Sequence, residues 1–109
     1  MTGADSGIGR AAARLFAREG AKVVAMDVND WGTPRVDQLI EQDEGQGLFV
    51  RGDVTSPGDW SRAVQAALDR FGDLHILFNN AGGGVRKPFH ELNDEEWNFV
   101  VNLNLHGTY

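Results

Sequence analysis

The sequence predicts an α/β fold built on a doubly wound parallel sheet. Three short apolar segments have the composition of buried β-strands: residues 21–28 (AKVVAMDV), 47–54 (GLFVRGDV) and 74–84 (LHILFNNAGGG). Segments with a helical spacing of apolar residues lie before and between them. Strands that alternate with helices pair in parallel, with helices covering the faces of the sheet. The chain has 109 residues, which fits one domain.

The first predicted helix begins at Ser6 and ends at Gly20. Its apolar residues recur every three or four positions, and its arginines occupy other faces. These apolar residues are Ile8, Ala11, Ala12, Leu15 and Phe16. A second, weaker helical pattern around Val36, Leu39 and Ile40 separates the first two predicted strands.

Capping residues predict two further helices. Ser56 is a suitable N-cap, and Pro57 suits the first helical position. The helix that they begin ends at Gly72, and its apolar face comprises Trp60, Ala63, Val64, Ala67 and Phe71. Asn93 and Glu96 have the spacing of a capping box, which opens a last helix through Trp97, Val100, Val101 and Leu105.

Composition and charge exclude several classes of function. The formal net charge of −6 and the lack of a Lys/Arg run argue against a nucleic-acid surface. The chain has no cysteine, and its histidines, at positions 75, 90 and 106, lack metal-ligand spacing, so we expect no metal site. No signal-peptide pattern or membrane-length apolar segment is present, so we expect a cytoplasmic protein. The loops NDWGTPR and GGGVRKP are predicted to be mobile.

A glycine-rich segment, TGADSGIG, stands at the start of the first helix. Its glycines, Gly3, Gly7 and Gly9, have the spacing GxxxGxG. Taken alone, this triplet fits a tight, closely packed turn as well as a phosphate loop. The helix that begins inside it directs free N–H groups and the positive end of its dipole at whatever the loop holds, which suits a pyrophosphate.

Asp27 is the next-to-last residue of the segment at residues 21–28, about 20 residues after the loop, where dinucleotide-binding proteins place an acid for the ribose 2′-hydroxyl. A strand-end aspartate that caps a turn is the alternative interpretation. A carboxylate also repels a 2′-phosphate, and Ser6 and Val28 supply no cation for one. The pattern therefore favours NAD over NADP.

With these features in place, the chain resembles the N-terminal part of a short-chain dehydrogenase/reductase. Four features match in order: TGADSGIG for the family's TGxxxGxG, Asp53-Val54, NNAG at residues 79–82, and Asn104 in WNFVVNLNLHGTY. Together they span essentially the whole chain. The resemblance implies an NAD(P)-dependent oxidoreductase that moves hydride between nicotinamide and an alcohol or carbonyl substrate, and a homo-oligomer for the complete protein.

The resemblance assigns roles position by position. It places the pyrophosphate and its ribose against Gly3, Ser6, Gly7, Ile8 and Gly9. It places the adenosine ribose at Asp27, the adenine between Asp53 and Val54, and the nicotinamide ribose against Asn80, Ala81 and Gly82. Asn79 is expected to brace the sheet. Asn104, rather than Asn102, matches the asparagine that kinks the last helix and helps to organise the family's proton relay.

The family's catalysis also uses a serine and a Tyr-x-x-x-Lys pair. In that arrangement the tyrosine transfers the hydroxyl proton, the lysine lowers its pKa, and the serine polarises the carbonyl. This chain has one tyrosine, Tyr109, with no lysine after it. A non-catalytic nucleotide-binding or interaction module is therefore the alternative to an enzyme.

The resemblance further implies an incomplete NAD-binding Rossmann-like domain over residues 1–109. In the family a strand leads into the Thr-Gly pair, and here Met1 stands in its last place. We expect a partial Rossmann-type sheet that lacks this first strand and the C-terminal half. Because the first strand is central in the order 3-2-1-4-5-6, we expect the chain to be marginally folded, to self-associate and to bind NAD weakly.

Overall fold

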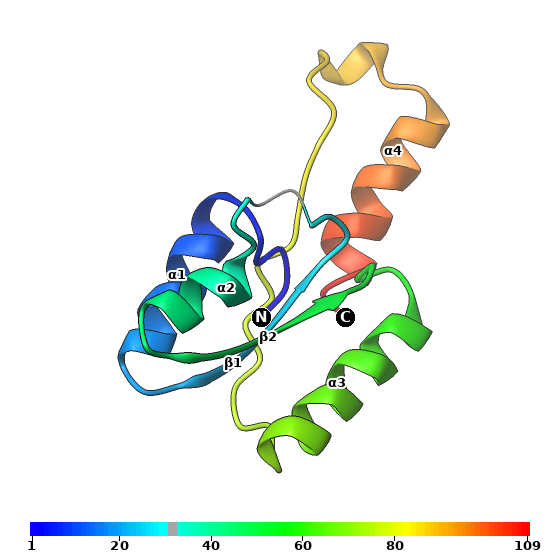
Figure 1. The fold of residues 1–109 in the computed structure, drawn as a ribbon. Helices are drawn as coiled ribbons and strands as arrows, with labels where there is room; N and C mark the ends of the chain where they lie inside the picture. Colours follow the sequence, from blue (N-terminus) through cyan, green and yellow to red (C-terminus); the bar gives the residue numbers. More distant parts are fainter. Residues whose placement is uncertain (31–32) are drawn as a thin grey trace.

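The computed structural model describes residues 1–30 and 33–109. Figure 1 shows helices on two sides of a short sheet, and a last helix that extends away from it. The regular elements are α1 (Gly7–Arg18), β1 (Lys22–Asp27), α2 (Val36–Gln42), β2 (Gln46–Arg51), α3 (Pro57–Phe71), a 3-10 turn (Phe89–Glu91), α4 (Asp94–Val101) and a π-helical segment (Asn102–His106). The predicted helices and the first two predicted strands are confirmed.

The two strands of the sheet are parallel, and Met1 and Thr2 pair with the free edge of β1 through a single isolated bridge. Strands β1 and β2 pair in register from Lys22↔Gln46 to Asp27↔Arg51. On the other side of β1, Thr2 forms a parallel bridge to Met26, and Met1 O accepts from Met26 N at 2.9 Å. Thr2 N then donates to Phe78 O at 3.1 Å. Met1 and Thr2 therefore lie between β1 and the segment around Phe78, as the predicted strand order requires.

The third predicted strand, at residues 74–84, does not form. Residues 73–88 form no strand, and in Figure 1 they run past the sheet as an irregular trace. A strand needs a continuous ladder of backbone hydrogen bonds, and Thr2 offers this segment only one such bond. Leu74, Ile76 and Leu77 are consequently exposed. Their apolar character is typical of a strand, but no neighbouring strand lies beside them among the described residues.

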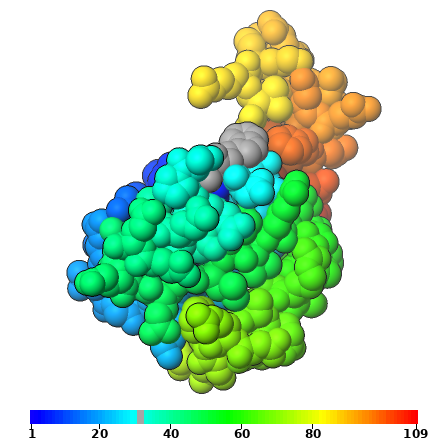
Figure 2. Space-filling view, in the orientation of Figure 1, coloured from blue at the N-terminus to red at the C-terminus, as the bar shows by residue number. Residues whose placement is uncertain are grey.

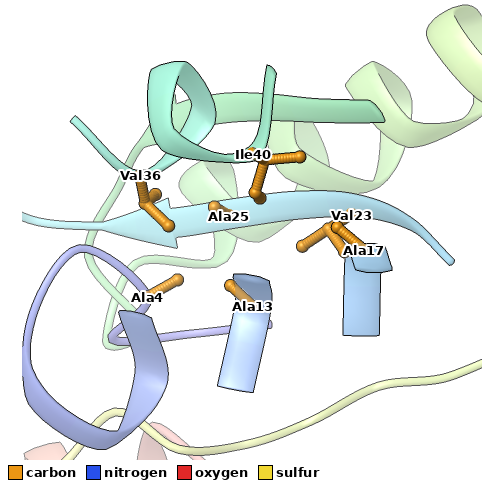
Figure 3. Packing of buried hydrophobic residues seen from close by; sticks show 7 residues of the cluster. All are labelled: Ala4, Ala13, Ala17, Val23, Ala25, Val36 and Ile40. Carbon is orange, nitrogen blue, oxygen red and sulfur yellow. The ribbon is translucent and has the colours of Figure 1, made fainter. Parts of the chain in front are cut away.

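The core lies between α1, β1 and α2. Its buried members, which converge in Figure 3, are Ala4, Ala13, Ala17, Val23, Ala25, Val36 and Ile40. The small side chains of α1 allow that helix to approach β1 closely. On the opposite face of the sheet, Met26 is buried beneath α3, whose Ala63 and Ala67 are buried too. Helices on both faces are the doubly wound arrangement that the sequence predicts.

The predicted capping residues are confirmed. The Ser56 hydroxyl accepts a hydrogen bond from Asp59 N, and Pro57 is the first residue of α3. Asn93 and Glu96 form a reciprocal capping box at α4, with Asn93 Oδ1 accepting from Glu96 N at 2.9 Å. These local bonds fix where each helix begins, because they satisfy N–H groups that have no partner inside the helix.

Residues 83–101 extend away from the rest of the molecule, as the yellow and orange surface in Figure 2 shows. Helix α4 buries none of its residues, and Trp97 and Phe99 are about half exposed. Phe89 packs edge-to-face on Trp97, with ring centroids 6.0 Å apart.

Within the described residues, no helix combines the length and the hydropathy needed to cross a bilayer. Of the two loops predicted to be mobile, NDWGTPR includes positions 31 and 32, which lie outside the described residues.

Candidate functional site

A cleft of about 520 Å³ opens at the carboxyl end of β1. It brings together residues from five separate parts of the chain: the glycine loop, the end of β1, the turn after β2, residues 80–82, and Leu103 of the π-helical segment. The predicted cofactor-binding residues that line it are Gly3, Ser6, Gly7, Ile8, Gly9, Asp27, Val54, Asn80, Ala81 and Gly82. Asp53 is the one predicted cofactor residue that does not.

The glycine loop leads directly into α1 at one wall of the cleft. The N-cap residue, Ser6, is exposed, and its hydroxyl makes no capping hydrogen bond. A Cβ on Gly9 would lie 2.0 Å from Gly3 O, so the loop can close on the helix only because residue 9 is glycine. Gly7, Ile8 and Gly9, the first three residues of this 12-residue helix, line the cleft, so the positive end of the helix dipole lies beside it. This is a suitable position for a phosphate.

Asp27 is half-buried at the end of β1, and two backbone N–H groups orient its carboxylate. Asp5 N donates to Asp27 Oδ2 at 2.9 Å, and Asn29 N donates to Oδ1 at 3.2 Å. Each oxygen has one such partner, and a carboxylate can accept about four hydrogen bonds in total. Acceptor positions thus remain for hydroxyl groups of a ligand in the cleft.

Asp5 ties the glycine loop to its surroundings and was not among the predicted residues. Its carboxyl group is buried, accepts from Arg10 at 3.1 Å, and accepts from Val36 N, the first residue of α2, at 2.8 Å. Arg10 Nε also donates to Asp5 O at 3.0 Å. Sequence gave no signal for the contact with Val36, which joins residues 31 positions apart.

Asn80 holds the opposite wall of the cleft against the glycine loop. Its side-chain amide donates to Thr2 O and Gly3 O, both at 3.1 Å. The buried Thr2 hydroxyl accepts from Asn80 N at 3.1 Å and from Ala81 N at 3.0 Å. The expectation that Asn79 braces the sheet is wrong for the described residues: Asn79 is exposed and makes no hydrogen bond there, whereas Asn80 both braces the loop and lines the cleft.

Asp53 lies beside the cleft rather than in it. Its Oδ1 accepts from Thr55 N and Thr55 Oγ1, both at 2.8 Å, so the side chain closes its own turn. It lines a smaller adjoining cleft that shares Val28 and Gly52 with the first. Asp53 N donates to Asp59 Oδ2 at 2.8 Å, and this bond, with help from Arg62, lowers the pKa of Asp59.

Val54 is buried at the floor of the cleft and is fixed from two directions. Trp60 Nε1 donates to Val54 O at 2.9 Å from the first turn of α3. On the other side, a Cβ on Gly107 would come within 2.6 Å of the Val54 side chain. The floor of the cleft therefore depends on α3 and on the end of the chain together.

Asn104 holds the last helix to the segment after NNAG. Its Nδ2 donates to Gly83 O and to Val100 O, both at 2.8 Å, and its Oδ1 accepts from Gly83 N at 3.2 Å. Val100 O is the carbonyl that an α-helix would pair with Asn104 N, and the chain here is π-helical, with Gly107 N bonded to Asn102 O. Asn104 does not line the cleft; its neighbour Leu103 does.

Sequence reasoning missed five residues that line the cleft: Met26, Val28, Asn29, Gly52 and Leu103. Four of them adjoin a predicted residue in sequence, so the motifs located the region but not its full lining. Among the described residues, no three His, Asp or Glu side chains gather as a metal site would require.

Comparison with known proteins places this geometry in context. The family model described as short chain dehydrogenase matches residues 1–109. The chain is 42% identical over 104 residues to 2,5-dichloro-2,5-cyclohexadiene-1,4-diol dehydrogenase LinX of Sphingobium indicum, covering 95% of this chain and 42% of that protein. It is 35% identical over 107 residues to the uncharacterized oxidoreductase Lmo0432 of Listeria monocytogenes, covering 98% of this chain and 43% of that protein.

Solved structures match equally well. A 3-ketoacyl-ACP reductase from Sinorhizobium meliloti superposes with a TM-score of 0.91 at 36% identity, covering 99% of this chain and 43% of that one. A hydroxysteroid dehydrogenase from Escherichia coli gives 0.89 at 37% identity, covering 98% and 45%. The chain thus spans less than half the length of these relatives.

Proposed function

The chain belongs to the short-chain dehydrogenase family, and we propose on that premise that it is the NAD-binding part of an oxidoreductase. The reaction proposed for the whole protein is hydride transfer between nicotinamide and an alcohol or carbonyl substrate. The bound dinucleotide would supply the hydride acceptor or donor. The residues of this chain would bind and orient it.

The observation that carries this proposal is the Asp27 carboxylate, held at the end of β1 by two backbone N–H groups. Its position, beside the glycine loop and on the same cleft, is where an acid would accept hydrogen bonds from the adenosine ribose. The same charge would repel a 2′-phosphate, which supports NAD over NADP.

The other wall of the cleft supports the second half of the proposed ligand. Asn80, Ala81 and Gly82 line it, and Thr2 holds their backbone in place. We propose that they contact the ribose next to the nicotinamide. Asn104 is proposed as a positioning residue, because its side chain is committed to the backbone of Gly83 and Val100.

Residues 1–109 contain a single tyrosine and no Tyr-x-x-x-Lys sequence. Positioned acid–base groups contribute roughly 10²- to 10⁴-fold to such reactions. We therefore expect purified residues 1–109 to show no turnover with an alcohol or ketone. Turnover that survives replacement of Asn104 and Asp27 would contradict this assignment of the chemistry.

The test of cofactor choice is titration of the chain with NAD and with NADP, observed through the ligand by NMR so that weak binding is measurable. The unaltered chain should prefer NAD. Replacing Asp27 by Ser together with Val28→Arg should shift the preference toward NADP by about 1–3 kcal/mol, the range for charge-assisted hydrogen bonds.

The matched control is Asp30→Ser, which removes an exposed carboxylate three residues further along and should leave the preference unchanged. Tighter binding of NADP by the unaltered chain would contradict the assignment of NAD. Binding of neither nucleotide would contradict the proposed site itself.

A further inference from the structure

An ion pair between the buried Asp5 carboxylate and the partly exposed Arg10 guanidinium is connected to Asp27 through the backbone of Asp5. Asp5 is 3% exposed, and its carboxylate is within 3.1 Å of the Arg10 guanidinium. Arg10 Nε also donates to Asp5 O, so the guanidinium is held to one residue by two contacts. Asp5 Oδ1 accepts a further bond from Val36 N, which fixes the carboxylate at the start of α2.

The pair is linked to Asp27 by a single residue. The amide of Asp5 donates to Asp27 Oδ2 at 2.9 Å, while the carbonyl and carboxylate of Asp5 hold Arg10. The guanidinium therefore lies one residue away from the carboxylate that we assign to the adenosine ribose. Because both groups are bonded to the same residue, they lie well within one Debye length of each other, which is about 30 Å at 0.01 M salt.

The state of Arg10 matters for a phosphorylated ribose. A 2′-phosphate favours guanidinium groups, which bind it with charge-assisted hydrogen bonds. The Asp5 carboxylate compensates the charge of Arg10, and the carboxylate and carbonyl of Asp5 together accept bonds from two of its five N–H donors. Another nearby guanidinium, that of Arg35, is likewise bound to a carboxylate, with two bonds of 2.7 Å to Asp37.

We propose that Asp5 is a second determinant of dinucleotide preference: by binding Arg10, it withholds from a 2′-phosphate a positive charge that is held by the same residue whose amide binds Asp27. This inference rests on the function proposed above. It makes Asp5 a positioning residue that acts through Arg10 and has no contact of its own with the ligand. In this proposal Asp27 repels the 2′-phosphate directly. Asp5 neutralises Arg10, whose positive charge would otherwise attract the phosphate and offset that repulsion.

The test is the ratio of the dissociation constants for NAD and NADP, measured for the 109-residue chain at low salt. Asp5→Asn keeps an acceptor for Val36 N but leaves Arg10 without its counter-charge, so the ratio Kd(NAD)/Kd(NADP) should rise about tenfold. Arg10→Gln leaves the Asp5 charge uncompensated and should lower the same ratio about threefold. The double variant restores a neutral pair and should return to within about twofold of the original value.

The control is Asp43→Asn. It changes the net charge as Asp5→Asn does and releases another arginine of α1, Arg14, which is bound to Asp43 through two bonds. Arg14 lies one helical turn further from the loop, so the ratio should stay within about twofold. Arg51, which donates to Val28 O, is unchanged in all variants, and its contribution cancels in the comparison.

The outcomes separate the two proposals. Equal weakening of NAD and NADP in both single variants, with the ratio unchanged, would assign Asp5 and Arg10 a purely structural role and overturn the inference. If the Asp5→Asn variant does not fold, the Arg10→Gln variant alone tests the inference: a lower ratio Kd(NAD)/Kd(NADP) supports it, and an unchanged or higher ratio overturns it. If the unaltered chain binds neither nucleotide, the proposed function fails and this inference fails with it. Opposite shifts in the two single variants, cancelled in the double variant, would establish it.

Discussion

The two walls of the cleft are built in different ways. Every buried hydrophobic residue of the described chain lies in residues 1–30 and 33–72, which we call the packed region. Residues 73–109, the exposed region, bury no hydrophobic side chain and are joined to the packed region near the cleft through Thr2 and Gly3. The adenosine side of the proposed ligand thus meets a surface fixed by packing, and the nicotinamide side meets one fixed mainly by hydrogen bonds.

This difference indicates how each wall can fail. Packing is lost when volume is removed from the core, whereas a hydrogen-bonded wall is lost when one acceptor disappears. Changes to apolar residues should therefore be costly in the packed region and nearly neutral in the exposed region. The following changes test that division, from the largest expected effect to the smallest.

Ile40→Ala should have the largest effect. Ile40 is fully buried, and its side chain lies against Gly45 and Gly47 at the start of β2. The substitution should lower the free energy of unfolding by about 3 kcal/mol, through lost burial and a cavity. Leu105→Ala, in the exposed region, removes a side chain that is 64% exposed and should cost less than about 0.5 kcal/mol. Urea unfolding measures both, and equal costs would contradict the division.

Gly9→Ala should cost about 2 kcal/mol, because its Cβ would fall 2.0 Å from Gly3 O and the glycine loop would have to move. Nucleotide binding should be lost in the same variant. Gly84→Ala is the matched change in the exposed region, where no atom lies within 4 Å of the added Cβ. It should leave stability and binding unaltered. Retention of NAD binding by the Gly9 variant would show that this loop does not hold the ligand.

Thr2→Val tests the junction between the two regions. It preserves the shape of the side chain but removes the acceptor for Asn80 N and Ala81 N, at a cost of about 1.5 kcal/mol. Amide exchange at residues 80 and 81 should accelerate while β1 stays protected. Thr2→Ser keeps the hydroxyl and should restore slow exchange at both amides. Slow exchange in the valine variant would mean that these bonds do not secure the wall.

A fall in pH should lower the stability of the packed region more than that of the exposed region, and the effect should be smaller than those of the substitutions above. Arg14 and Arg18 of α1 hold the pKa of Asp43 at about 2, against an ordinary value of 3.8. The contribution of this ion pair is therefore complete above pH 3.8 and lost as the pH falls toward 2.

Asp43→Asn should flatten the acid dependence of unfolding in that window. Lys87 lowers the pKa of Glu96 in the same direction, but α4 buries nothing, so Glu96→Gln should leave the unfolding of the packed region unchanged. If the free energy of unfolding depends on pH in the same way in the Asp43 variant and the unaltered chain, this ion pair does not contribute to stability.

The local part of the fold was predictable from the sequence. Ser56 and Asn93 begin their helices through bonds to residues three positions away, and such short-range signals can be read directly. The glycine loop and Asp27 were found because their spacing reflects the geometry of one strand, one turn and one helix.

Contacts between distant residues were harder to predict. Residues 74–77 have a strand-like composition, yet a strand depends on neighbours that composition does not specify. Asn79 and Asn80 are adjacent residues of the same type, so the sequence alone does not show which of them makes the bracing bonds. The position of Thr2, which bonds to Asn80, distinguishes them. No sequence pattern marks Asp5, because its role depends on hydrogen bonds to Asp27 and Val36, which are distant in the sequence.

The central claim is that one dinucleotide spans both walls of the cleft, and a residue-resolved NMR titration of the ¹⁵N-labelled chain with NAD tests it most directly. Light scattering should accompany it to confirm a constant particle size, because Leu74, Ile76 and Leu77 are exposed. We predict saturable shift changes at the amides of Gly7, Gly9 and Val28 in the packed region and of Ala81 and Gly82 in the exposed region, with a single dissociation constant. Changes confined to one wall, or absent from both, would contradict the account.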